Sequence, residues 1–426
     1  MRRPKFTGSI LILLIAFLLW IPAVYNLPPV QEQLGWRAAE LLARFKYALS
    51  PPEQIVFVPE EKSSLPTQTV SPRSSPPVHV SVTSTQIPSI KQPTASHTTA
   101  LPIPKSNQLV GVRHEYQTWN NCGPVTLGMA LSYWGWEGDQ RPIAAFTKPN
   151  SRDKNVMPYE MAAYVEEETQ FMAVVRAGGD LELLKRFLAA GLPVIVEKGF
   201  EGPDFEGWMG HYVLVTGYSD QDQIFTLQDS YYGPNQVMDY TDLESYWRAF
   251  NFTYLVVYPA ERQVELTAIL GPQSDEEYNY TYAAQKASDD IYALAGHDQF
   301  FAWFNRGTNL VQLQDYVSAA GAYDEAFALY PAMPEKERPW RMMWYQTGPY
   351  QAYYHAGRYQ DVINLSPTTL DAMSEPVLEE SFYWRALARE ASGDNKGAIK
   401  DLRWALKYHP GFEPALTKLQ QLGITP

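Results

Sequence analysis

The fold is decided by residues 117–135, which read QTWNNCGPVTLGMALSYWG and hold the only cysteine of this 426-residue chain. Pro124 suits a first helical position, because proline lacks only an N–H group that the start of a helix leaves unpaired anyway. Apolar residues then recur with helical spacing up to a glycine stop; they are Leu127, Ala130, Leu131 and Trp134, before Gly135. The sequence therefore predicts a helix with one buried stripe and Cys122 at its N-terminus.

A cysteine in this position has a chemical meaning. The helix dipole and the free N–H groups at a helix N-terminus favour the thiolate, which is the nucleophilic form of the side chain. The alternative is a buried structural cysteine, which is common in globular proteins. The remainder of the chain has to decide between the two interpretations.

Composition excludes several classes of function. The formal net charge of −13 argues against a nucleic-acid partner. A lone cysteine leaves no intramolecular disulfide and no zinc site built on several thiolates. The acidic residues show no metal-ligand spacing, so we predict neither a metal nor another cofactor.

The N-terminal part predicts a membrane anchor followed by a spacer. Residues 1–7 form a basic cytoplasmic flank, and residues 8–27 form an apolar transmembrane signal anchor, with a cleaved signal as the alternative. Residues 28–50 predict an amphipathic stem, which either lies on the membrane or has no specific role. Residues 51–107 are rich in Pro, Ser and Thr and predict an extended linker. The main body is therefore expected outside the cytoplasm, on a single-pass membrane protein.

Residues 108–260 predict an α+β domain with a small antiparallel sheet. The expected elements after the cysteine helix are a helix over 181–190, a strand over 194–196, a hairpin of 212–218 with 224–229, and a strand over 252–258. The polar turn 219–223 joins the two strands of the hairpin.

Residues 299–426 predict an all-α domain, joined to the first by a connector over 261–298. Two copies of one helix-pair pattern carry this prediction: the first comprises Trp303, Gly307, Leu310, Ala319, Tyr323, Ala326 and Pro331, the last Phe382, Ala386, Ala398, Leu402, Ala405 and Pro410. The pattern resembles tetratricopeptide repeats, which implies a surface that binds a protein or peptide. An unrelated helical bundle remains the alternative.

A cysteine nucleophile needs a general base and a group that orients the base. Within the α+β domain, the histidines are His114 and His211, and His211 opens a predicted strand that would hold it rigidly. A hairpin turn centred on Gln221 makes position 213 face position 229. Asp229 is then a diagonal neighbour of His211, on the same sheet face. A register slip of one residue would place Asp229 on the wrong face.

These residues resemble cysteine peptidase family 39, the bacteriocin-processing branch of the papain-like fold. The resemblance covers about residues 108–260 and is carried by Gln117, the Cys122-Gly-Pro helix start, the segment GHYVLVTGY at 210–218, and Asp229-Ser. The segment from Leu181 to Val196 is also similar.

The resemblance implies a role for each of four residues. Cys122 would be the nucleophile, His211 the general base and acid, and Asp229 the group that orients His211. Gln117 would form the oxyanion hole together with the backbone N–H of Cys122. One departure concerns Gln117, which lies five residues before the cysteine, whereas the family usually has six.

The sequence as a whole thus predicts a membrane-anchored, extracytoplasmic cysteine peptidase. It would combine a papain-like α+β domain, a tetratricopeptide-like domain and a transmembrane helix. Its partners would be a peptide or protein substrate and a protein or peptide ligand on the repeats. Relatives that cut double-glycine leaders are typically fused to a transporter, so a different substrate is expected here. The alternatives are an inactive scaffold, and a transglutaminase or amidase that uses the same triad.

Overall fold

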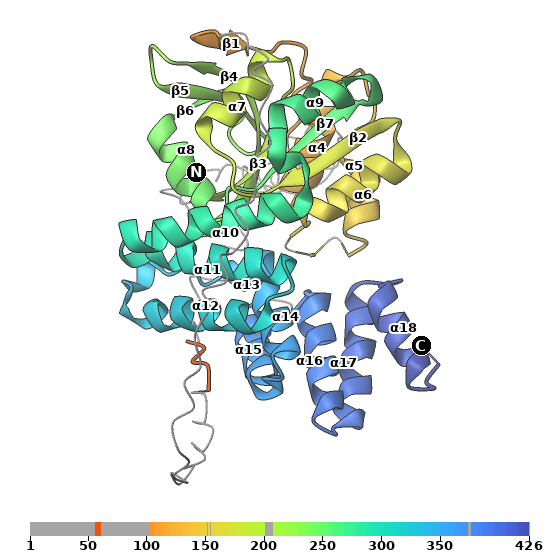
Figure 1. Cartoon of the computed structure of the whole chain (residues 1–426). Helices are drawn as coiled ribbons and strands as arrows, with labels where there is room; N and C mark the ends of the chain where they lie inside the picture. The colour runs from red at the N-terminus through yellow and green to blue at the C-terminus, as the bar shows by residue number, and fades with distance from the viewer. Residues whose placement is uncertain are drawn as a thin grey trace, which may run out of the picture.

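The computed structural model describes residues 56–60, 103–150, 152–153, 155–200, 208–373 and 376–425. A sheet-containing domain is followed by a helical C-terminal region, and the two are in contact (Figure 1). The predicted flank 1–7, anchor 8–27 and stem 28–50 lie outside the described residues, as does most of the linker. Within the described part of the chain, no helix is long and apolar enough to cross a membrane.

The sheet-containing domain consists of a mixed series of strands and helices. Its strands are β1 (Ser106–Gln108), β2 (Phe171–Arg176), β3 (Val194–Phe200), β4 (Met209–Ser219), β5 (Ile224–Asp229), β6 (Gly233–Asp239) and β7 (Tyr254–Pro259). Its helices are α4 (Cys122–Tyr133), α5 (Gln140–Thr147), α6 (Pro158–Glu168), α7 (Leu181–Ala189) and α8 (Tyr240–Arg248). The predicted helix over 181–190, the hairpin and both other predicted strands are confirmed, with β3 and β4 longer than expected.

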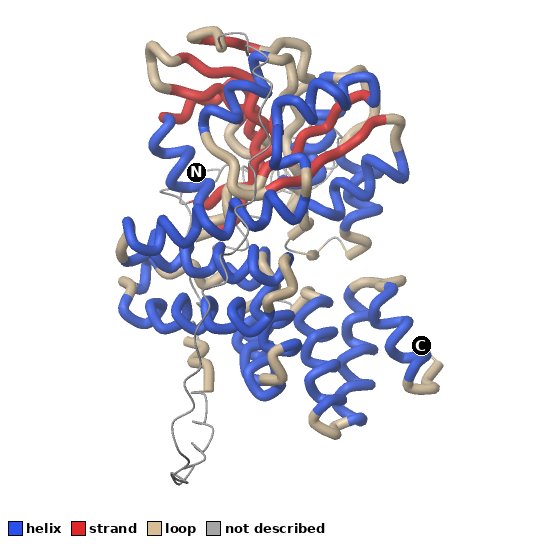
Figure 2. The backbone as a smooth tube through the Cα atoms, in the orientation of Figure 1, coloured by secondary structure: helices blue, strands red, loops and turns tan. Residues whose placement is uncertain are grey.

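The strands form one seven-stranded sheet in the order β2-β7-β3-β4-β5-β6, with β1 also paired to β4. Every pairing is antiparallel. Apolar side chains alternate between two cores, one on each face of the sheet. Figure 2 shows the strands of this sheet among the helices of the same domain. Tyr212 and Leu214 face α4 to α6, whereas Val213 and Val215 face α7 and α8. Helices on both faces explain why β3 is buried along its full length.

The cysteine helix differs from its prediction in two respects. It begins at Cys122, with Asn121 as N-cap, so Pro124 is the third helical residue and not the first. Residues 123–131 are all buried, so the helix has no single buried stripe. It lies between the sheet and α5 and α6, and a helix covered on several sides must be apolar all round. The predicted stop is observed, because Gly135 has a φ of 85° directly after the C-cap.

The helical region starts earlier than expected, because the predicted connector over 261–298 is itself helical. It contains α9 (Gln263–Leu270), α10 (Glu276–Ala293) and the short 3-10 turns Ala260–Arg262 and Gly271–Ser274. The following helices are α11 (Gly296–Gln312), α12 (Tyr316–Leu329), α13 (Met342–Tyr345), α14 (Gly348–His355), α15 (Tyr359–Asp371), α16 (Glu379–Ala391), α17 (Asn395–Tyr408) and α18 (Glu413–Gln421), with 3-10 turns at Tyr330–Ala332 and Glu335–Glu337.

Consecutive helices pack as antiparallel pairs, with α11 on α12 and α16 on α17 (Figure 1). Gly307 shows why the sequence pattern requires a small residue in α11. A Cβ atom there would lie 2.7 Å from the ring of Tyr323 in α12. Glycine therefore lets the two helices approach closely at this point.

The two parts of the molecule share a buried aromatic contact. Trp208, which precedes β4, stacks on Phe250 with ring centroids 5.5 Å apart and meets Tyr345 of α13 edge-on at 5.9 Å. Arg341 donates from Nη1 to the backbone oxygen of Trp208 at 2.9 Å. The helical region is thus packed directly against the start of the strand that carries His211.

Candidate active site

The thiol of Cys122 lies at the N-terminus of α4 and is half-buried. The side chain of His211 is near enough to act on the pKa of this thiol. Burial alone would raise the pKa of the Cys122 thiol, but the hydrogen bond and charge of His211 outweigh it, and the pKa lies below its usual value. The helix N-terminus acts in the same direction, since its unpaired N–H groups favour negative charge. The arrangement therefore favours a thiolate next to an imidazolium.

His211 and Asp229 form a buried pair, 6% and 3% exposed. Nε2 of His211 lies 3.0 Å from Oδ1 of Asp229, which leaves Nδ1 as the ring nitrogen for the thiol. Burial alone would lower the pKa of His211, but the charge and hydrogen bond of Asp229, with a contribution from Cys122, raise it to about 9. The imidazole is therefore protonated at neutral pH.

A β-bulge sets the register that brings this pair together. Near the turn, Ser219 pairs with Ile224, but beyond the bulge Leu214 pairs with Gln228. The ladder shifts by one residue between Val215 and Gly217, which leaves Thr216 as the extra residue. Without this shift, Asp229 would face Leu214 and point to the opposite sheet face from His211. The predicted pairing of 213 with 229 follows from the observed register only because of the bulge.

Asp229 is held as a carboxylate by several groups. It accepts hydrogen bonds from the backbone N–H groups of Tyr231 and Tyr232, at 2.8 and 3.1 Å. Burial alone would raise the pKa of Asp229, but the charge and hydrogen bond of His211 and the charge of Lys198 hold it well below its usual range. Lys198 is 2% exposed and sits opposite His211 in the β3–β4 ladder. Burial lowers the pKa of Lys198 to about 8.

Gln117 is fixed beside the residue that follows Asp229. Ser230 donates from Oγ to Oε1 of Gln117 at 2.9 Å, and the backbone N–H of Gln117 donates to the oxygen of Ser230 at 3.1 Å. With Oε1 so occupied, the Nε2 end of the amide is the donor end that an oxyanion would require. The structure thus gathers Gln117, Cys122, His211 and Asp229 around the junction of α4, β4 and β5.

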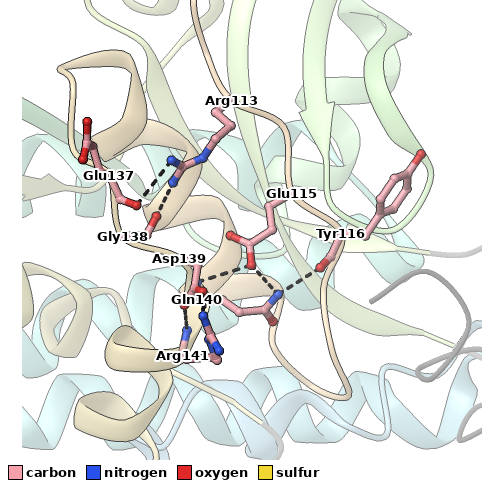
Figure 3. Close-up of polar contacts among 8 residues, drawn as sticks. All are labelled: Arg113, Glu115, Tyr116, Glu137, Gly138, Asp139, Gln140 and Arg141. Atoms are coloured by element: carbon pink, nitrogen blue, oxygen red, sulfur yellow. Dashed lines mark hydrogen bonds and ion pairs between the residues drawn. The ribbon is translucent and has the colours of Figure 1, made fainter. Parts of the chain in front are cut away.

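The loop that carries Gln117 and leads into Cys122 is organised by Gln140, the first residue of α5 (Figure 3). Nε2 of Gln140 donates to Oε1 of Glu115 at 2.7 Å and to the oxygen of Tyr116 at 2.9 Å. Oε1 of Gln140 accepts from Thr118 N and from Asn121 Nδ2, at 2.9 and 2.7 Å. One amide, 3% exposed, therefore ties together both ends of the loop before the cysteine.

Further contacts keep α5 and its neighbouring turn in place beneath this loop. Arg113 donates from its guanidinium to the backbone oxygens of Glu137 and Gly138 (Figure 3). Lys148, at the other end of α5, donates from Nζ to the oxygen of Asn120 at 2.7 Å. The charge of Lys148 also contributes to lowering the pKa of Cys122.

Glu197 is a second buried carboxyl group close to the site, and its pKa shifts in the opposite direction from that of Asp229. It pairs with Tyr212 across the β3–β4 ladder and is 5% exposed. Burial raises the pKa of Glu197 well above its usual value, and the nearby Cys122 adds to this shift. The shift favours the neutral form of the Glu197 carboxyl, whereas His211 and Lys198 favour the charged form of Asp229.

Sequence reasoning missed the supporting residues Gln140, Lys148, Lys198 and Tyr345. Each acts through contacts between segments distant in the chain, and none stands in a recognisable motif. His114, the other histidine considered, contacts Tyr116 edge-on at 4.8 Å between ring centroids. Burial lowers the pKa of His114, so it remains a neutral imidazole at pH 7. Among the described residues, no group of His, Cys, Asp and Glu could hold a metal ion.

The fold and the site define a class. A helix starts at the cysteine, and an antiparallel sheet carries the histidine and the aspartate. Residues 100–255 match the family model described as Peptidase_C39 like family, and the chain carries a domain of this kind over that range. The matched range includes Gln117, Cys122, His211 and Asp229.

Among solved structures, a candidate C39-like peptidase from Bacillus anthracis is similar to this chain. The match has a TM-score of 0.30 and 16% identity, and it covers 36% of this chain and 98% of that chain. The comparison with curated proteins finds no match.

Proposed function

We propose that the chain is a cysteine peptidase that cleaves peptide bonds through Cys122, His211 and Asp229. The observation that carries the proposal is the buried pair of His211 Nε2 and Asp229 Oδ1, 3.0 Å apart, together with His211 lowering the pKa of the thiol at the N-terminus of α4. This is the arrangement of nucleophile, base and orienting group that acyl transfer requires.

The reaction would proceed in two steps. The Cys122 thiolate attacks the carbonyl carbon, and the protonated His211 gives its proton to the leaving amine as the peptide bond breaks, which leaves a thioester on the sulfur. Neutral His211 then takes a proton from water, and the resulting hydroxide attacks the thioester and releases the acid and the Cys122 thiolate, beside a His211 that is protonated again. The amide of Gln117 and the backbone N–H of Cys122 would stabilise the oxyanion in both steps.

The proposal includes a location and a second binding activity. Residues 8–27 would anchor the protein, with the basic residues 1–7 in the cytoplasm and the main body outside it, which the apolar run and its flanking charge support. The helical region would bind a protein or peptide, which its stacked helix pairs support. Protease treatment of intact cells tests the location: the main body should be degraded and the N-terminal flank protected.

A peptide-library digest tests the catalytic proposal. The wild-type protein should cleave a subset of the peptides, and C122A and H211A should cleave none while circular dichroism shows that both are folded at the assay temperature. H355A is the matched control, because His355 is an exposed histidine of α14, and it should retain full activity. An added primary amine distinguishes the transglutaminase alternative, which would give an amide product in place of the free acid. Turnover by H211A, or no turnover by the wild type, would contradict the mechanism.

A further inference from the structure

A short segment far from the active site lies on the helical region. Residues 56–60, which read VFVPE, are here named the latch segment. In Figure 1 it lies beyond α12, away from the sheet-containing domain. It contacts α12, α14 and α15, and one of its bonds spans 301 positions of the sequence. This part of the predicted linker is therefore not a free spacer.

Phe57 anchors the latch segment. It is 6% exposed and meets Phe327 of α12 edge-on, with ring centroids 5.0 Å apart, and Tyr353 of α14 at 6.1 Å. The next residue, Val58, is 68% exposed. A buried aromatic side chain next to an exposed residue is how a short peptide occupies a groove, since the anchor supplies most of the contact area.

The helical region also binds the backbone of the latch segment. Asp361 of α15 accepts from the backbone N–H of Glu60 at 2.8 Å, and Asn364 donates from Nδ2 to Oε1 of Glu60 at 3.4 Å. Asp361 is 3% exposed, and its other oxygen accepts from Nε of Arg358 at 2.6 Å. A buried carboxylate held by an arginine and directed at a peptide N–H recognises an extended chain whatever its side chains are.

The groove contains a hydrogen-bond donor and a cavity that the latch segment does not occupy. Nη2 of Arg358 is buried and has no hydrogen-bond partner among the described residues. A cavity of about 50 Å³ remains beside Phe57. Its lining is aromatic and rich in methionine: Phe300, Tyr330, Trp340, Met342 and Met343 take part. Methionines adapt their shape to different side chains, so this lining suits exchange of one occupant for another. The fit is that of a binding site with a ligand and not that of a filled core.

We propose that this groove, formed by Phe327, Tyr353, Arg358, Asp361 and Asn364, is a binding site for peptides with the pattern aromatic, any residue, proline, acidic residue. The latch segment is its occupant in the resting chain, bound in cis, and a peptide of the same chemistry displaces it. One ring and two hydrogen bonds make a weak contact, which the covalent tether sustains at millimolar effective concentration. The proposal stands apart from the catalytic function and holds whether or not the peptidase site is active.

Fluorescence anisotropy with a labelled peptide of residues 53–62, EQIVFVPEEK, tests the proposal on the full chain. The wild type should bind the peptide weakly, because the tethered segment competes with it. F57A should bind it at least tenfold more tightly, because its own segment no longer fills the groove. The same peptide with Ala in place of its Phe should bind neither protein.

Asp361→Asn in the F57A background provides the second arm, because it keeps the shape of the acceptor and removes its charge. Binding should weaken at least fivefold relative to F57A, with circular dichroism confirming that the fold persists. If the double variant unfolds, two comparisons still test the proposal: the affinity of F57A against that of the wild type, and the affinity for the Phe peptide against that for the Ala peptide. Equal affinity for wild type and F57A, or for the Phe and Ala peptides, would overturn the proposal. A wild-type dimer in light scattering that F57A dissociates would overturn binding in cis.

Discussion

One carboxylate sets the protonation state of the candidate site. Asp229 raises the pKa of His211 to about 9, and His211 in turn lowers the pKa of Cys122. The thiolate and the imidazolium therefore stabilise each other across neutral pH. The two charged forms are lost at opposite ends of the pH range. The thiolate is protonated at low pH, and the imidazolium loses its proton as the pH rises through about 9.

Asp229→Asn tests this dependence with little change of shape. The amide oxygen can still accept from His211, but the negative charge is gone, so the pKa of His211 should fall from about 9 toward its ordinary 6.5. Alkylation of Cys122 at pH 7 should slow on the order of tenfold, since the thiolate loses its cation. An NMR titration of the His211 ring measures the shift. An unchanged pKa would mean that Asp229 is only a structural partner.

Gln140→Leu tests the organisation of the cysteine loop. The substitution leaves Glu115, Thr118 and Asn121 without their amide partner in a buried setting, which should cost about 2–3 kcal/mol of stability. Hydrogen exchange of residues 115–121 should accelerate, and alkylation of Cys122 should slow. Gln236→Leu is the control, because its amide bonds only to Pro234 within the exposed strand β6. Unchanged hydrogen exchange in residues 115–121 would mean that Gln140 does not hold the cysteine loop in place.

At the scale of residues, local sequence signals predicted the candidate site residues but not the residues that hold them in place. Cys122, His211 and Asp229 were found because a lone cysteine before a helix, a histidine opening a strand and an aspartate ending the next strand are local signals. Gln140 was missed because its role depends on a loop conformation that no spacing rule describes. The polar network in Figure 3 exists only once α5 has folded back under the loop.

At the scale of elements, α13 (Met342–Tyr345) connects the helical region with β4, the strand that carries His211. Tyr345 is 6% exposed and packs where β4 begins. A Cβ atom on Gly210 would lie 3.0 Å from the ring of Tyr345 and 2.6 Å from that of Phe250, so only glycine fits just before His211. The helical region thus shapes the strand from which the base projects.

Tyr345→Ala should affect the site although the residue lies in the helical region. The lost ring leaves a cavity beside Gly210, which should cost about 3–5 kcal/mol of stability and loosen the start of β4. Alkylation of Cys122 at pH 7 should slow in the folded protein. Phe382→Ala is the matched control: Phe382 is a buried aromatic of α16, stacked on Trp404 and Tyr408, and its loss should lower stability alone. Equal rates in both variants would mean that α13 does not support the site.

Element boundaries were predicted well where a turn or glycine marks them, and less well where packing decides. The hairpin of β4 and β5 follows from alternation and its polar turn. The bulge at Thr216 has no sequence signal of its own, yet the pairing of His211 with Asp229 depends on it. The predicted turn centre at Gln221 lies half a residue before the observed one, which alone would shift every expected partner by one residue. The bulge shifts the ladder back by one residue, so that position 213 faces position 229 as predicted.

At the scale of the whole molecule, the sheet-containing domain and the helical region pack against each other. The sequence separates them by composition, but it does not reveal the aromatic contact at Trp208 or the buried acidic cluster between α6 and α16. Glu160 of α6 lies near Glu379 of α16, which accepts from His409 at 2.6 Å. Such contacts join surfaces whose apposition follows from the tertiary structure alone.

This interface should make stability depend on pH. Burial, with a smaller contribution from Glu379 and Asp153, raises the pKa of Glu160 to about 8, against about 4.5 in the unfolded chain. Between these values the folded state holds the extra proton, so stability falls as the pH rises toward 8. Replacement of Glu160 by Gln should flatten the decline by about 2 kcal/mol, measured by denaturant unfolding at pH 6 and pH 8. Glu166→Gln, an exposed position of the same helix, is the control, and an unflattened decline in E160Q would contradict the assignment.

The most direct test of the account is the rate of Cys122 alkylation by iodoacetamide as a function of pH, with and without His211→Ala. The lone cysteine makes the signal unambiguous. The account predicts fast modification well below the ordinary thiol pKa of about 8.5, and loss of that reactivity in the histidine variant. Slow modification that rises only near that value, or equal rates in both proteins, would show an inert cysteine and would contradict the proposed catalytic pair.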